Sequence, residues 1–158
     1  MGGDVEYRRL GTTDLQVSAL GFGTWEFGNP GYGHTDEAEA VAAIHRALDL
    51  GITCIDTAAG YGLGRSEEIV GRALGARRKD VVLVTKCGLA WDEANPYAPQ
   101  RRDSSPPRIL KEIDDSLRRL GTDWIDLYLV HWPDPTTPIA ETAATMAAIV
   151  QAVKARYV

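Results

Sequence analysis

Three apolar segments of this chain each end in an ionisable side chain. The segments are 52–56, 81–86 and 127–131, and their last residues are Asp56, Lys86 and His131. Short apolar runs bounded by turn signals predict buried strands, and parallel α/β proteins bind their ligands at the carboxyl ends of the strands. We therefore expect these side chains to meet at one edge of a sheet. Tyr61, in a turn of small residues after the first segment, completes the set, which predicts a proton-transfer site.

The rest of the chain alternates predicted strands with predicted helices. Further strands are expected at 19–23, at 125–131 around the third segment, and at 155–158. Helical spacing of apolar residues predicts helices at 36–50, 66–74, 104–120 and 137–154. Thr35 or Asp36 can cap the first helix and Ser66 the second, while Gly51 and Gly121 end the first and the third. Strands that alternate with helices imply right-handed crossovers and a parallel sheet.

Composition limits the partners and the location. The 158 residues suffice for an apolar core, so residues 1–158 are treated as one domain. The net charge of −5 argues against nucleic acid or an anionic membrane as the main partner. No apolar run approaches the ~20 residues of a membrane span, and no secretory signal pattern is present at the N-terminus. Cys54 and Cys87 are interpreted as reduced thiols of a cytoplasmic protein, and no metal site is expected.

Five sequence motifs resemble those of the aldo-keto reductase family. They are Leu20-Gly-Phe-Gly-Thr-Trp25, Asp56-Thr-Ala-Ala-Gly-Tyr-Gly62, Ser66-Glu-Glu-Ile-Val-Gly71, Val84-Thr-Lys86 and Ile125-Asp-Leu-Tyr-Leu-Val-His-Trp-Pro133. Each motif alone is weak evidence, whereas five in the family's order, spread over most of the chain, are specific. The resemblance is strongest to bacterial members related to the stress-associated and inositol-linked reductases, and extends more distantly to potassium-channel β-subunits.

The resemblance implies an α/β fold, the (β/α)8 TIM barrel, of which this chain would form the N-terminal half. A complete barrel needs roughly 250 residues. Residues 19–158 would supply about four β/α units and the start of a fifth strand. Residues 6–18 would form a β-hairpin that closes the bottom of the barrel. The segments that grip the adenosine phosphate of the cofactor would follow Val158.

The resemblance also implies a catalytic tetrad for carbonyl reduction. Tyr61 would be the general acid, and Lys86 would tune its acidity, because a nearby ammonium stabilises a phenolate. Asp56 would pair with Lys86, and His131 would orient the carbonyl group. The hydride would come from NADPH.

Cofactor and substrate contacts are implied in the same way. The candidate cofactor contacts are Gly23, Thr24, Trp25 and Asp56. The candidate residues of an apolar substrate pocket are Trp25, Trp91 and Trp132. The long loop 87–103 separates Lys86 from His131 by more than in many family members, which leaves the choice of substrate open.

Each of these residues has an ordinary structural explanation as well. Tyr61 could be a surface aromatic residue, Lys86 a solvated strand end, His131 a hydrogen-bonded structural group and Asp56 the start of a turn. Their joint occurrence in the family's order makes these explanations improbable. The glycine-rich stretch 60–64 lacks the G-x-G-x-x-G pattern of a Rossmann loop, because Arg65 stands in place of the last glycine.

Three functions remain open. The chain could belong to an NADPH-dependent reductase of small aldehydes or ketones, to a non-catalytic redox-sensing module like a channel β-subunit, or to a half-barrel assembly unit. We expect the isolated chain to be inactive. We also expect it to self-associate through its sheet edges and inner face, since unpaired edges and exposed apolar surface drive association. The expected inner-face residues are Ile52, Cys54, Val82, Val84, Leu127 and Leu129.

Overall fold

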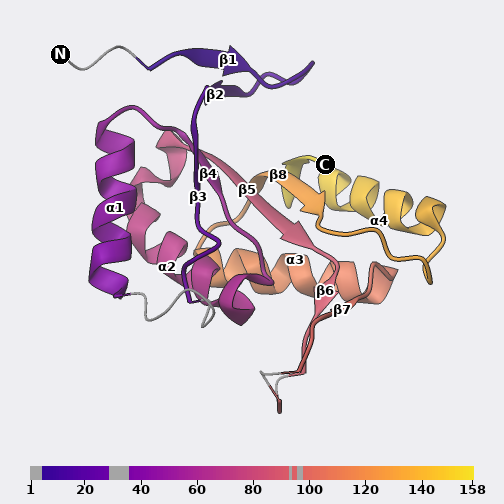
Figure 1. Cartoon of the computed structure of the whole chain (residues 1–158). Coiled ribbons are helices and arrows are strands. Elements are labelled where there is room, and N and C mark those ends of the chain that lie inside the picture. Colours follow the sequence, from indigo (N-terminus) through magenta and orange to yellow (C-terminus); the bar gives the residue numbers. More distant parts are fainter. Residues whose placement is uncertain (1–4, 29–35, 93, 96–97) are drawn as a thin grey trace.

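A five-stranded parallel sheet is the centre of the computed structural model, which describes residues 5–28, 36–92, 94–95 and 98–158 (Figure 1). The strands are β3 (Gly21–Gly23), β4 (Cys54–Asp56), β5 (Val82–Cys87), β8 (Ile125–Val130) and β9 (Ala155–Tyr157). They lie in the order β3-β4-β5-β8-β9, so each main strand pairs with the next one along the chain. This is the succession that a partial (β/α)8 barrel requires, as the sequence predicted.

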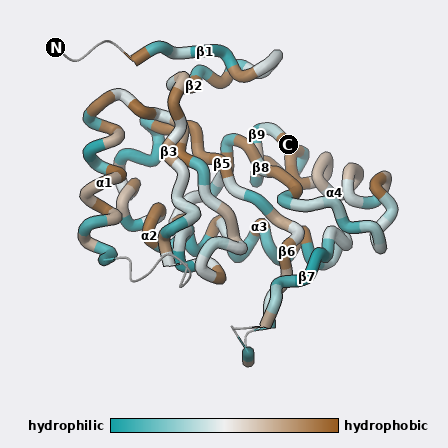
Figure 2. Tube along the Cα trace, viewed as in Figure 1, coloured by the Kyte–Doolittle hydropathy of each residue, from teal (hydrophilic) through white to brown (hydrophobic). Residues whose placement is uncertain are grey.

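Four α-helices alternate with these strands among the described residues. They are α1 (Glu37–Asp49), α2 (Arg65–Leu74), α3 (Pro106–Leu120) and α4 (Ile139–Gln151). One apolar core joins them to the sheet, and it includes Ile44 of α1, Ile69 of α2, Ile113 of α3 and Ile149 of α4. The hydropathy colouring shows apolar and polar residues alternating along the helices and strands (Figure 2). The apolar core therefore lies between the helices and the sheet, and the rim at the carboxyl ends of the strands lies outside it, where polar side chains can gather.

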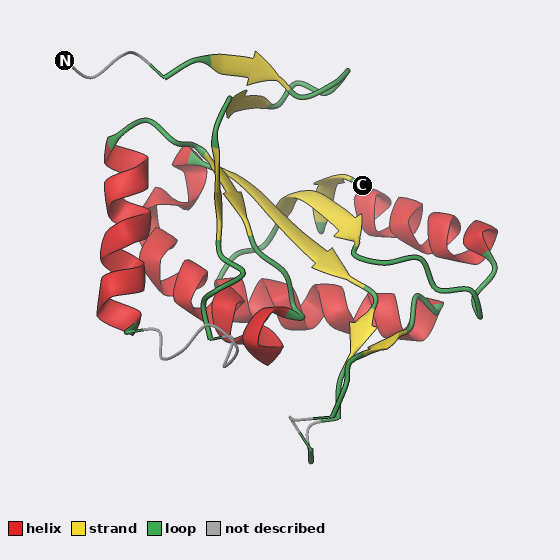
Figure 3. Ribbon diagram, viewed as in Figure 1, coloured by secondary structure: helices red, strands yellow, loops and turns green. Residues whose placement is uncertain are grey.

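An antiparallel hairpin precedes the sheet, as expected. Strand β1 (Tyr7–Arg9) pairs with β2 (Gln16–Ser18), and both lie at one end of the sheet (Figure 3). Leu15 and Val17 of the hairpin form a second apolar cluster with Val82 of β5. The hairpin thus covers apolar side chains at the start of the strands, away from the rim where the strands end.

Two local expectations about helix starts have different outcomes. Asp36 caps α1 with a 3.1 Å bond from the Glu39 amide N–H to its carboxylate. The prediction that Ser66 caps the second helix is wrong. Helix α2 begins one residue earlier, after Gly64, whose φ of 94° places it in the left-handed region. Ser66 is instead fully buried, because the helix turns its side chain toward the sheet.

The expected uncovered inner face is partly covered. Val82 and Val84 are buried at 8% and 6% exposure, which corrects the expectation that they would lose their cover. Val82 is covered by the hairpin cluster. The other members are only half-buried; they are Ile52, Cys54, Leu127 and Leu129.

The segment after β5 is more ordered than the sequence suggests. The predicted loop 87–103 contains a small hairpin of β6 (Leu89–Ala90) and β7 (Arg101–Arg102). Two-residue strands carry no alternating pattern, so periodicity cannot reveal them. Two short 3-10 segments complete the described elements, η2 (Tyr61–Gly64) before α2 and η3 (Gly75–Asp80) after it. None of the described helices is long and apolar enough to cross a membrane.

Candidate active site

Lys86 is the centre of a polar cluster where the strands end. Its ammonium lies 2.8 Å from both carboxylate oxygens of Asp56 and 2.9 Å from the Thr57 carbonyl oxygen. It also lies 3.1 Å from the Tyr61 hydroxyl. The Lys86 side chain is only 13% exposed, so this charge is largely withdrawn from water and depends on these partners.

Tyr61 reaches Lys86 because of an unusual turn. Gly62, Leu63 and Gly64 all have positive φ, at 56°, 54° and 94°. A side chain on Gly62 would meet the backbone of Gly28 at 2.8 Å, so only glycine fits there. Leu63 accepts a conformation that non-glycine residues rarely adopt, and such strain is typical of functional segments. The turn leads directly from Tyr61 into helix α2.

His131 completes the cluster from the neighbouring strand. Its ring makes an edge contact with Tyr61 at 5.5 Å between centroids, and its backbone N–H donates to the Cys87 carbonyl at 2.8 Å. Burial lowers the pKa of His131 below its usual 6.5, the nearby Lys86 lowers it further, and Asp56 opposes them. A lowered pKa keeps the imidazole neutral near pH 7, so it can donate a hydrogen bond without carrying a charge.

The candidate cofactor residues lie beside Asp56. Gly23 of β3 pairs in register with Asp56 of β4, and nothing lies within 4 Å of the position that a Gly23 side chain would occupy. Thr24 is fully buried, and both its N–H and its hydroxyl donate to the Asp56 carbonyl at 3.0 Å. Trp25 follows with about half of its surface exposed, at 49%. The open space over Gly23 fits the approach of a flat ring such as a nicotinamide. The hydroxyl of Thr24, in contrast, is already bonded to the backbone carbonyl of Asp56.

The other two candidate tryptophans lie in different surroundings. Trp132 stacks on His131 at 6.3 Å between ring centroids and carries the Arg102 guanidinium at 5.3 Å over its ring. Trp91 lies under the Arg108 guanidinium, at 5.4 Å, and lines a polar hollow with residues of α2 and α3. No described contact of Trp91 involves the tetrad. The structure therefore places Trp132, but not Trp91, next to the polar cluster.

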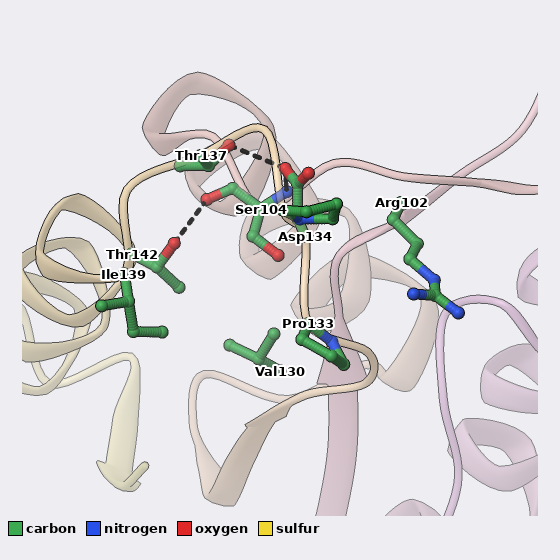
Figure 4. Close-up of a pocket in the computed structure, with 9 residues that line it drawn as sticks. Arg102, Ser104, Val130, Pro133, Asp134, Thr137, Ile139 and Thr142 are labelled. Atoms are coloured by element: carbon green, nitrogen blue, oxygen red, sulfur yellow. Dashed lines mark hydrogen bonds between the residues drawn. The ribbon is translucent and has the colours of Figure 1, made fainter.

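A small hollow of about 270 Å³ lies between the segment after β8 and the start of α4 (Figure 4). Its apolar walls include Val130, Pro133 and Ile139, and Thr142 donates to the Ser104 carbonyl at its edge. None of the four tetrad residues lines it. The polar cluster around Lys86 therefore remains the candidate site, on the geometry of its side chains.

Several residues that support the cluster lie within the family motifs but outside the predicted site. Thr57 supplies a carbonyl to Lys86, and Ser66 and Glu67 of α2 are fully buried behind the rim. Ser66 lies 9 positions from its hydroxyl partner Thr57, and Glu67 lies 18 positions from its partner Thr85. Contacts at such separations depend on the packing of α2 against the sheet, so no local pattern could have found them.

The cluster can donate a proton from the tyrosine hydroxyl and stabilise the phenolate that is left. An ammonium in contact with a phenol favours the phenolate left after proton transfer, and a neutral imidazole can hold an oxygen atom nearby. None of these side chains can donate a hydride, so a reduction at this site needs a redox cofactor. The described residues contain no group of three or more potential metal ligands.

A parallel α/β sheet with a Lys-centred polar cluster at its carboxyl-end rim is the arrangement expected of a partial (β/α)8 barrel protein. Residues 19–158 match the family model "Aldo/keto reductase family". The aldo-keto reductase YhdN of Bacillus subtilis is 45% identical over 156 residues, which cover 98% of this chain and 46% of that protein. A holo-form aldo-keto reductase from Bacillus halodurans superposes with a TM-score of 0.88 at 39% identity, over 97% of this chain and 49% of that one. The chain belongs to the aldo-keto reductase family.

Two further relatives indicate how varied this family is. One is named NADH-specific methylglyoxal reductase, from Escherichia coli, and is 43% identical over 87% of this chain and 46% of its own length. Another is named a probable voltage-gated potassium channel subunit beta, from Oryza sativa, and is 39% identical over 90% of this chain and 42% of its own. The chain spans about half the length of the curated relatives it matches. The resemblance to both reductases and channel subunits is thereby confirmed.

Proposed function

We propose that this chain supplies the proton-donating half of an NADPH-dependent reductase that converts small aldehydes or ketones to alcohols. The contact of the Lys86 ammonium with both the Asp56 carboxylate and the Tyr61 hydroxyl carries this proposal. That arrangement serves a tyrosine that must release its proton and is hard to explain as a solvated strand end. It also agrees with the family to which the chain belongs.

In this mechanism Tyr61 and His131 hold the carbonyl oxygen of the substrate. A nicotinamide, when bound, would supply a hydride to the carbonyl carbon and would itself be oxidised. As that bond forms, the electron pair of the C=O π bond moves onto oxygen, which takes the proton of the Tyr61 hydroxyl. Lys86 stabilises the resulting phenolate, and Asp56 holds Lys86 in place. Solvent returns a proton to Tyr61 after the alcohol leaves.

Gly23, Trp25 and Asp56 would hold the nicotinamide end of the cofactor, with Thr24 fixing the backbone between them. Trp25 and Trp132 would form apolar walls for the substrate, since both are about half exposed beside the cluster. We place most other cofactor contacts in the part of the barrel that lies outside this chain. We also propose a cytoplasmic location, which the free thiols of Cys54 and Cys87 support.

A redox-sensing module is the second candidate, supported by the identity to a channel subunit. A steady-state assay on the full-length protein that contains this chain separates the two. We expect NADPH oxidation that depends on an aldehyde, with NADH as the weaker donor. A protein that binds NADPH tightly but turns over no aldehyde or ketone in a broad panel would favour the module. Faster turnover with NADH would overturn only the cofactor preference.

A further inference from the structure

The first turn of α2 contacts the chain neighbours of the catalytic residues. The Ser66 hydroxyl lies 3.0 Å from the Thr57 hydroxyl and donates to the Thr24 carbonyl at 2.9 Å. The Glu67 carboxylate accepts a 2.7 Å bond from the Thr85 hydroxyl. Thr57 follows Asp56 in the chain, and Thr85 precedes Lys86. Two adjacent helix residues are thus bonded to the strands that carry two members of the tetrad.

The third member, Tyr61, is joined to the same turn through the backbone. The segment Tyr61–Gly64 runs without a break into α2, which begins at Arg65. On its other side, helix α2 packs against α3. Its Gly71 packs so closely on α3 that an added side chain would lie 2.7 Å from the Arg119 carbonyl oxygen. The Arg119 side chain donates to the other Glu67 oxygen at 2.7 Å.

The hydroxyl protons of this cluster form one consistent set. The Thr57 hydroxyl can donate to Ser66, the Ser66 proton can be shared between the Thr24 carbonyl at 2.9 Å and the Thr24 hydroxyl oxygen at 2.7 Å, and the Thr24 hydroxyl can donate to the Asp56 carbonyl. Each hydroxyl then donates once, and every donor has an acceptor. Fully satisfied buried polar networks rigidify their surroundings. Loss of one member leaves a buried partner unpaired, which is costly.

The side chains of this network do not contact solvent, so they cannot be polar merely to keep the protein surface soluble. The five residues are fully buried, at 0% exposure; they are Thr24, Thr57, Ser66, Glu67 and Thr85. Apolar residues of similar volume would pack there without the cost of desolvation. What the polar set adds is directional bonding between α2 and the two strands that carry Asp56 and Lys86.

We propose that Ser66 and Glu67 are positioning residues, which hold the Tyr61 hydroxyl within hydrogen-bond distance of the Lys86 ammonium by bonding Thr57 and Thr85. This inference rests on the proposed reductase function. Its consequence is a loss of kcat rather than of binding, because the groups touch neither substrate nor cofactor. A displacement of about 1 Å at a reacting centre can cost on the order of 10²-fold in rate.

The test compares two substitutions at one position in the full-length protein. Thr85→Val keeps the shape of the side chain but removes the hydroxyl that Glu67 accepts, whereas Thr85→Ser keeps the hydroxyl. We expect Thr85→Val to lower kcat by roughly tenfold to 100-fold, with KM for the aldehyde and Kd for NADPH within about twofold. Thr85→Ser should restore most of kcat. Thr57→Val and Thr57→Ser repeat the comparison at the Ser66 bond if Thr85→Val does not fold.

A matched control separates positioning from a general loss of stability. Thr142 of α4 is also buried, and its hydroxyl donates to the Ser104 carbonyl at 3.1 Å, away from the tetrad. Thr142→Val should lower the thermal midpoint about as much as Thr85→Val while leaving kcat unchanged. Equal losses of kcat in the two variants would overturn the positioning role.

The remaining outcomes distinguish the two proposals. If the wild type is active, Tyr61→Phe is inactive, and a folded Thr85→Val has wild-type kcat, the positioning role is wrong and the reductase proposal stands. If the wild type reduces no aldehyde or ketone, the reductase proposal is wrong and the positioning role falls with it.

Discussion

The three protons of the Lys86 ammonium are matched by three neighbours: Asp56, the Thr57 carbonyl and the Tyr61 hydroxyl. Two of these neighbours are fixed acceptors, so the ammonium cannot swing away from the phenol without losing them. His131 is held differently, by its position at the end of β8 and by ring contacts with Tyr61 and Trp132. The contact of Lys86 with Tyr61 is therefore supported by hydrogen bonds, whereas His131 is supported mainly by packing.

The lowered pKa of His131 makes the stability of the protein depend on pH. Burial and Lys86 disfavour the imidazolium in the folded state, so the unfolded chain binds a proton at higher pH than the folded chain. The free energy of unfolding should therefore fall, relative to His131→Gln, as the pH drops from about 6.5 through the folded-state pKa. Above pH 7 the difference between the two proteins should be constant. Urea titrations from pH 5 to 8 test this, and parallel curves over the whole range would contradict it.

The turn that presents Tyr61 is the element on which the site depends most. Gly62 and Gly11 share a φ of 56°, but only Gly62 lies against another backbone segment. Gly11→Ala should therefore cost about 1 kcal/mol of unfolding free energy, from the left-handed conformation alone. Gly62→Ala should cost clearly more and should also lower kcat, because the clash with Gly28 displaces Tyr61. Thermal unfolding and steady-state rates of both variants provide the check, and equal effects would show that the close contact is unimportant.

The same element shows what the sequence could and could not predict. The strand-end positions of Asp56, Lys86 and His131 follow from apolar runs that stop at ionisable residues, and the structure brings these residues together. The start of α2 was predicted one residue late, because Ser66 followed by two glutamates looks like a capping signal. The left-handed conformations before it, and the buried partners of Ser66, result from packing between segments far apart in the chain.

At the scale of the whole molecule, the sheet has two edges in the part of the chain that the structure describes. Strand β3 pairs only with β4, and β9 only with β8, while Leu127 and Leu129 are half-buried on the face away from the core. We therefore predict that the isolated 158-residue chain self-associates. Light scattering over a dilution series should show a mass above that of the monomer at micromolar concentration. A compact monomer that unfolds cooperatively and binds no apolar dye would contradict this.

The isolated chain should also be inactive. It holds the proposed proton donor, but as proposed above most cofactor contacts lie outside it, so no hydride is held in place. Titration of NADPH into the purified chain, followed by nucleotide fluorescence, should show no binding at micromolar concentrations. Micromolar binding with turnover of an aldehyde would show that these residues suffice for the whole reaction.

The proton-donor role of Tyr61 is tested most directly by kcat of the full-length protein with an aldehyde and NADPH. Tyr61→Phe removes one hydroxyl and little volume, and general acid catalysis is worth typically 10²–10⁴-fold, so kcat should fall by roughly that factor with NADPH binding unchanged. Tyr7→Phe is the matched control, since the Tyr7 hydroxyl donates to the Gly51 carbonyl at 2.8 Å and lies in the hairpin at the opposite end of the sheet from the polar cluster. It should keep kcat. Wild-type kcat in Tyr61→Phe would show that Tyr61 is not the acid.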